Sequence, residues 1–86
     1  MNTRFIKELH RVQGLVQQEL TFIDCGESKY DPTQINLIRN ELAKMEEALD
    51  PKVFLPVYPR LIVDSWDFSS PLGLDLLSLA QLYRNL

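Results

Sequence analysis

Apolar side chains recur along this chain at alternating spacings of three and four residues, which is the pattern of amphipathic helices. In the first segment these positions are Phe5, Leu9, Val12, Val16, Leu20 and Ile23. Thr3 precedes them as a potential N-cap, and Gly26 follows them where a glycine suits the end of a helix. The pattern predicts a first helix over residues 3–24.

The clearest helix start in the chain is the sequence DPTQ. Asp31 can cap the free amides, Pro32 suits the first helical position, and Gln34 can complete a capping box. The apolar positions that follow are Ile35, Ile38, Leu42, Met45 and Leu49. These features predict a helix over residues 32–49 with a narrow apolar seam for another helix.

Prolines break the next segment. Asp50 and Pro51 end the second helix, and Pro56 and Pro59 exclude a long regular helix through VFLPVYP. A proline-broken connection is therefore expected over residues 50–59.

The sequence RLIVDSW is ambiguous because its β-branched residues also suit a strand. A strand needs a pairing partner, however, and no other segment of the chain offers one. We therefore expect one helical turn near residues 51–55 and a third helix over 59–66. An extended conformation over 53–63 is the alternative.

Ser70 and Pro71 repeat the arrangement of a cap followed by a proline. The apolar positions after them are Leu72, Leu74, Leu76, Leu77, Leu79, Leu82, Tyr83 and Leu86. They predict a fourth helix over residues 71–85, either central in the protein or with apolar surface left for a partner. The expected fold is all-α, a compact bundle of about four helices that forms a single domain over residues 1–86.

Composition fits an ordinary globular domain. The chain has 86 residues, of which 45% are apolar and 24% charged, which is enough for one modest hydrophobic core. No apolar run approaches the roughly 20 residues that span a bilayer, and the N-terminal MNTRFIKELHRVQ lacks the apolar core of a signal peptide. We therefore expect a cytoplasmic protein without membrane contact.

The net charge is −3, and the acidic excess begins in the second helix. From Glu41 onward the acidic residues are Glu41, Glu46, Glu47, Asp50, Asp64, Asp67 and Asp75, against Lys44, Lys52 and Arg60 before the final turn. Direct nucleic-acid binding is disfavoured because it requires a basic surface. A basic protein partner suits this charge.

Residues for catalysis are few. His10 is the only histidine and Cys25 the only cysteine, and they lie about 22 Å apart along one helix. We interpret His10 as a solvated residue beside Arg11 and Cys25 as a semi-buried apolar residue near a helix end. Zinc usually needs three or four histidine, cysteine or carboxylate ligands, and the three glycines are isolated. We therefore expect no enzyme activity, no metal and no cofactor.

Binding is the better interpretation. The segment 58–68 mixes aromatic and acidic residues, which is typical of protein-binding hot spots. Ile62 and Trp66 share one helix face, so Trp66 is expected in the core while Asp64 and Asp67 point outward. The candidate partner-binding residues are Glu46, Glu47, Asp50, Tyr58, Asp64 and Asp67.

The chain also resembles a known kind of protein over residues 34–86. The segments that carry the resemblance are, in order, IRNELAKMEEALD, a proline-broken segment leading to RLIVDSWDF, a serine–proline step and a leucine-rich end in QLYRNL. This order resembles the small all-helical immunity proteins of bacteria. Such proteins counteract toxins of type VI secretion or contact-dependent inhibition. The resemblance implies a cytoplasmic inhibitor that occludes the active site of a toxin, often a nuclease or an NAD-degrading enzyme, and it carries over no particular binding residue.

The expected function is therefore neutralisation of a basic protein toxin through an acidic, partly apolar surface. The alternative is a small helical adaptor, secretion chaperone or homodimer that uses the leucine-rich segment 72–86. A small enzyme built on His10 is the least favoured hypothesis.

Overall fold

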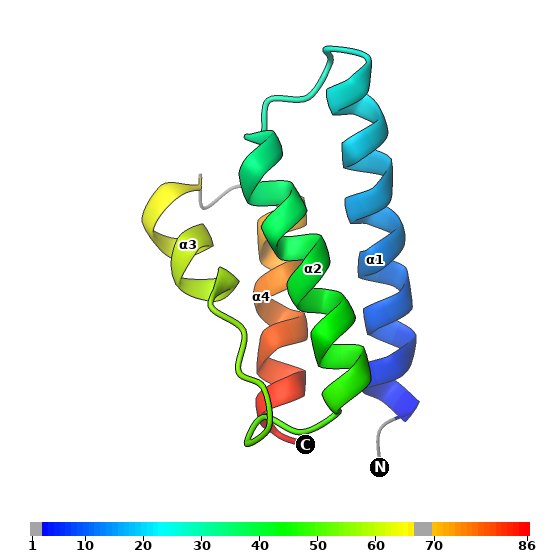
Figure 1. Ribbon diagram of the computed structural model, residues 1–86, viewed down its shortest axis with the longest axis vertical. Helices are drawn as coiled ribbons and strands as arrows, with labels where there is room; N and C mark the ends of the chain where they lie inside the picture. Colours follow the sequence, from blue (N-terminus) through cyan, green and yellow to red (C-terminus); the bar gives the residue numbers. More distant parts are fainter. Residues whose placement is uncertain (1–2, 67–69) are drawn as a thin grey trace.

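Four helices pack around one core in a computed structural model of the chain, which describes residues 3–66 and 70–86 (Figure 1). The helices are α1 (Thr3–Asp24), α2 (Pro32–Ala48), α3 (Tyr58–Ser65) and α4 (Pro71–Arg84). The described part contains no strand, so the predicted all-α bundle is confirmed. The molecule measures 39 × 23 × 19 Å along its principal axes.

The long helices α1 and α2 run antiparallel, and α4 packs against α1 (Figure 1). The short helix α3 lies to one side, where it contacts α4 and α2. None of the helices within residues 3–66 and 70–86 has the length and apolar character needed to cross a membrane.

Both ends of α1 follow from local backbone chemistry. The bounds of α1 are the predicted ones, but Thr3 is the first helical residue and therefore not the N-cap that precedes the helix. At the other end Gly26 has φ 75°, and the amides of Gly26 and Glu27 donate to the carbonyls of Ile23 and Phe22 at 3.0 and 2.8 Å. This pattern is a Schellman motif, which confirms the predicted glycine stop.

The start of α2 agrees with the prediction only in part. The carboxylate of Asp31 accepts a hydrogen bond from the amide of Thr33 at 2.8 Å, and Pro32 occupies the first turn. Gln34 does not complete a capping box, because its Oε1 accepts a hydrogen bond from the indole of Trp66 at 2.9 Å. The predicted capping box is therefore wrong.

The connection after α2 begins with a single helical turn, as predicted. The Oδ1 of Asp50 accepts from the amide of Lys52 at 2.8 Å, and its carbonyl accepts from Val53 and Phe54 at 3.0 and 3.1 Å. The hydroxyl of Tyr83 lies 2.8 and 2.6 Å from the carbonyl oxygens of Asp50 and Phe54 and donates to either one. Tyr83 thereby holds the turn against α4.

The core contains residues from all four helices. Its completely or almost completely buried apolar residues are Phe5, Leu9, Val12, Val16, Ile35, Ile38, Leu42, Met45, Tyr58, Ile62, Leu76, Leu79, Ala80 and Tyr83. Trp66 is 9% exposed, which confirms that it packs inward. Ser70 caps α4 by accepting from the amide of Gly73 at 3.2 Å. Most of the leucine-rich stripe of α4 is buried within the bundle, and Leu74 remains exposed.

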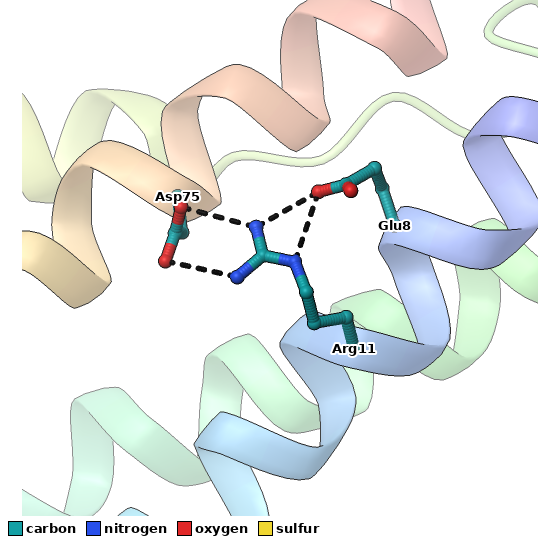
Figure 2. Close-up of polar contacts among 3 residues, drawn as sticks. All are labelled: Glu8, Arg11 and Asp75. Atoms are coloured by element: carbon teal, nitrogen blue, oxygen red, sulfur yellow. Dashed lines mark hydrogen bonds and ion pairs between the residues drawn. The ribbon is translucent and has the colours of Figure 1, made fainter.

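An arginine links α1 to α4 at the surface (Figure 2). Arg11 donates to Asp75 on α4 at 3.1 and 3.4 Å and to Glu8, one turn earlier on its own helix, at 2.8 and 3.2 Å. These hydrogen bonds raise the pKa of the Arg11 guanidinium further above its ordinary value. Arg11 is therefore a fixed positive charge between two carboxylates.

Candidate protein-binding surface

The predicted acidic residues lie at two separate places. Glu46 and Glu47 are near the end of α2 and Asp50 follows it, whereas Asp64 is near the end of α3. Because Trp66 contacts Gln34, the end of α3 lies beside the start of α2. About 18 Å of helix separates that point from Glu46 at a rise of about 1.5 Å per residue. The described acidic candidates therefore do not form one continuous face, and Asp67 lies outside the described residues.

Glu46 is engaged within the protein. One carboxylate oxygen lies 2.9 Å from His10 Nε2, and the other accepts a hydrogen bond from Gln13 at 3.4 Å. These contacts from α1, with His10 the larger cause, lower the pKa of Glu46 below its ordinary value. The predicted solvated His10 is exposed and also takes part in a contact between α1 and α2.

Asp50 and Tyr58 have structural positions. The Asp50 side chain is half-buried and caps the turn after α2. Tyr58 is completely buried, and its hydroxyl donates to the carbonyl of Leu76 at 2.8 Å. Burial, together with the nearby charge of Glu41, raises the pKa of Tyr58. Tyr58 is therefore removed from the partner-binding set, because a side chain at the interface of α3 and α4 presents no surface.

Glu47 and Asp64 remain available to a partner. Glu47 is exposed near the end of α2. The side chain of Asp64 is 64% exposed and lies 3.7 Å from Arg60, one turn earlier on α3. Such an exposed pair is weak, so it leaves the carboxylate of Asp64 free to interact with other groups.

An apolar row that the sequence analysis did not identify lies on the connection between α2 and α3. Val53, Leu55 and Val57 are 73%, 52% and 62% exposed, while Pro56 between them is buried. We call these three residues the connection ridge. The segment VFLPVY contains no charged residue, so its sequence alone does not indicate which of its side chains face solvent.

The buried carboxylate of Glu41 was also missed. Glu41 contributes to the acidic excess of the sequence, but it is only 8% exposed. It accepts hydrogen bonds from the amide of Val57 at 3.0 Å and from the amide of Tyr58 at 2.7 Å. The sequence contains a signal for this burial, since position 41 lies one helical turn from both Ile38 and Met45, which belong to the apolar seam of α2. Glu41 therefore caps α3 from a neighbouring helix.

Groups for metal or thiol chemistry do not come together in the part of the chain that the structure describes. No cluster of three histidine, cysteine or acidic residues is arranged there to hold a metal ion. Cys25 is exposed rather than semi-buried, because it directly follows the last residue of α1, beside Gly26.

In comparisons with known proteins, the chain matches no family model, no curated protein and no solved structure.

Proposed function

We propose that this chain is an immunity protein that binds a bacterial protein toxin and occludes its active site. The observation that carries the proposal is the connection ridge, where three exposed apolar side chains occur at alternate positions of one short segment. Neighbouring exposed apolar residues are typical of protein-binding surfaces. The resemblance of residues 34–86 to immunity proteins and the acidic excess support the same function.

The two kinds of surface have different roles in the proposal. The connection ridge forms the water-excluding centre of the contact, and its burial holds the complex together. The exposed carboxylates of Glu47 and Asp64 lie outside that centre and attract a basic toxin, such as a nuclease or an NAD-degrading enzyme. Changes to the charges are therefore expected to act on association, and changes to the ridge on dissociation.

The test starts with the protein encoded next to this gene. It is expressed in bacteria with and without this chain, and growth is measured. The proposal requires that the neighbour is toxic alone and that this chain restores growth. A harmless neighbour, or a toxic one against which this chain gives no protection, contradicts it.

Binding kinetics then locate the surface. The double variant Glu47→Lys with Asp64→Lys is expected to slow association with the toxin by about tenfold at low salt and less at high salt. Leu55→Ser is expected to accelerate dissociation by about tenfold or more. Glu27→Lys, an exposed charge change in the connection between α1 and α2, serves as the control and should alter neither rate. Wild-type kinetics in both test variants would refute this surface.

The alternative function is that of a helical adaptor, secretion chaperone or homodimer. It is supported by Leu74 and Leu86, which are 53% and 40% exposed at the two ends of the leucine-rich segment. Sedimentation equilibrium tests the homodimer. A strict monomer at high protein concentration eliminates it.

A further inference from the structure

The connection ridge occupies alternate positions of one segment of the chain. Its three side chains are exposed, and the residues that follow each of them are the partly or fully buried Phe54, Pro56 and Tyr58. Because outward and inward positions alternate here, a shift of the segment by one residue would turn the ridge inward. The shape of the ridge therefore depends on the contacts that fix the segment in this register.

Tyr83, near the end of α4, holds the first end of this segment (Figure 1). Its hydroxyl lies 2.6 Å from the carbonyl oxygen of Phe54, which is between the first two ridge residues, and 2.8 Å from that of Asp50. The ring of Tyr83 is completely buried, and its centroid lies 5.5 Å from that of Phe5 in α1. The hydroxyl therefore connects the start of the ridge to the core.

Glu41 of α2 holds the second end of the segment. Its carboxylate accepts hydrogen bonds from the amide of Val57, the last ridge residue, at 3.0 Å and from the amide of Tyr58 at 2.7 Å. Only Leu55 and Pro56 lie between the two held ends, and the ring of the buried Pro56 restricts its own backbone. Two groups of the core thus fix the ridge from behind while its side chains face solvent.

A surface that has its binding shape before the partner arrives loses less conformational freedom in the complex, and it therefore binds more tightly. Without the two holds, the ridge side chains would have to be ordered during binding. Tyr83 is the clearer of the two holds to examine, because the carboxylate of Glu41 also caps α3.

We propose that Tyr83 is a positioning residue for the connection ridge: its hydroxyl keeps the ridge in the shape that binds the partner, without touching that partner. The inference rests on the proposed function for the identity of the partner. It adds to the binding surface a residue that is itself completely buried. The effect of Tyr83 on the ridge is measurable in the free protein, so the two proposals can fail separately.

Two matched variants separate this role from a general contribution to stability. Tyr83→Phe removes only the hydroxyl that contacts the segment before and within the ridge. Tyr58→Phe removes a second hydroxyl of the same kind, since Tyr58 is equally buried and donates to the carbonyl of Leu76 at 2.8 Å. Each variant loses one buried hydrogen bond to a backbone carbonyl. A purely structural role therefore predicts the same effect from both.

Hydrogen exchange in the free protein is the first measurement. The amides of Val53 and Phe54, which donate within the turn at 3.0 and 3.1 Å, and the amide of Val57 report on the ridge. In Tyr83→Phe these amides should exchange about fivefold faster than in Tyr58→Phe. Amides in the middle of α1 are the internal reference and should exchange alike in the two variants. Equal exchange at the ridge amides overturns the proposal.

Binding to the toxin is the second measurement. Tyr83→Phe should accelerate dissociation by about threefold or more and change association by less than about twofold, whereas Tyr58→Phe should change neither rate beyond about twofold. In the Leu55→Ser background the effect of Tyr83→Phe should be smaller, because the ridge that it positions is already impaired. Dissociation of Tyr83→Phe at the wild-type rate, or an undiminished effect in the Leu55→Ser background, overturns the positioning role.

The two measurements also distinguish the two proposals. If the neighbouring protein is harmless, the proposed function fails. Faster exchange at the ridge in Tyr83→Phe than in Tyr58→Phe still supports the role of Tyr83 in that case, and equal exchange still overturns it.

Discussion

The carboxylate of Glu41, in the middle of α2, accepts a 2.7 Å hydrogen bond from the amide of Tyr58, the first residue of α3. At the other end of α3, Trp66 donates to Gln34 of the same helix α2. At about 1.5 Å per residue, about 10 Å of α2 and about 12 Å of α3 separate these two contacts. Because these two lengths are similar, α2 can hold the short helix α3 at both of its ends.

Loss of the Glu41 carboxylate should loosen α3. Val57 provides no side-chain cap for this helix, so Glu41→Ala leaves the amides of Val57 and Tyr58 without their acceptor. We expect the free energy of unfolding to fall by about 1–3 kcal/mol, as measured by urea denaturation. Hydrogen exchange at the amides of α3 should accelerate more than exchange in α1.

Two variants control this prediction. Glu41→Gln retains one acceptor oxygen and should therefore lower the free energy of unfolding less than Glu41→Ala does. Glu47→Ala removes an exposed carboxylate from the same helix and should change stability by no more than about 0.5 kcal/mol. If Glu41→Ala and Glu47→Ala change the free energy of unfolding equally, the Glu41 carboxylate at the start of α3 contributes nothing to stability.

Two glycines in helices should respond differently to replacement by alanine. A Cβ at Gly14 meets nothing within 4 Å, so Gly14→Ala should stabilise the protein by about 0.5–1 kcal/mol. A Cβ at Gly73 would lie 3.2 Å from Trp66 and 3.4 Å from Ile62, in the contact between α4 and α3. Gly73→Ala should therefore be less stable than Gly14→Ala by about 1 kcal/mol or more.

Thermal unfolding compares the two alanine variants, and Trp66 fluorescence adds a local readout. Only the variant at Gly73 should shift the emission, because only its new methyl group touches the indole ring. Equal stabilisation by both substitutions would contradict the close packing of α3 on α4.

Stability should decline in alkaline solution because of Tyr58. Its pKa in the folded protein is raised above the ordinary value of 10.0, by burial first and by the charge of Glu41 second. The folded state therefore retains a proton that the unfolded state releases. The stabilising contribution is complete below pH 10 and is lost as pH rises through the folded pKa.

Urea denaturation between pH 8 and about 11 tests this dependence, with Tyr58→Phe as the comparison. The phenylalanine variant loses the hydrogen bond to Leu76, which costs about 1 kcal/mol at neutral pH. Above pH 10, its stability should fall less steeply than that of the wild type. Parallel curves for the two proteins would rule out ionisation of Tyr58 as a cause.

The arginine contact between α1 and α4 should depend on salt. A double-mutant cycle with Arg11→Gln and Asp75→Asn is expected to give a favourable but small coupling, because both side chains are partly exposed. The coupling should disappear near 1 M NaCl, where the screening length is about 3 Å. The exposed pair of Arg60 and Asp64, 3.7 Å apart, should show no measurable coupling at any salt concentration. A coupling between Arg11 and Asp75 that resists salt would contradict this prediction.

The sequence by itself determined the helices, because their signals are local. Asp31 and Ser70 cap helices whose first residues are prolines, and Gly26 ends α1 in the left-handed conformation. Apolar spacing placed Trp66 in the core. The lack of a pairing partner for a strand favoured α3 despite its β-branched residues. A helix start, a helix stop and an apolar face each depend on residues within one or two turns, so one sequence is enough to find them.

Only the tertiary structure decided which polar residues face solvent. Whether a carboxylate is buried depends on donors that reach it from elsewhere, and the amides that donate to Glu41 belong to Val57 and Tyr58 at the start of α3. Tyr58 is buried in the core, where its hydroxyl donates to Leu76 of α4. The pairing of α2 with α3 separates Asp64 from Glu46 and Glu47. Helix periodicity describes one helix at a time, whereas the cost of burying a charge is set by the groups that surround it after packing.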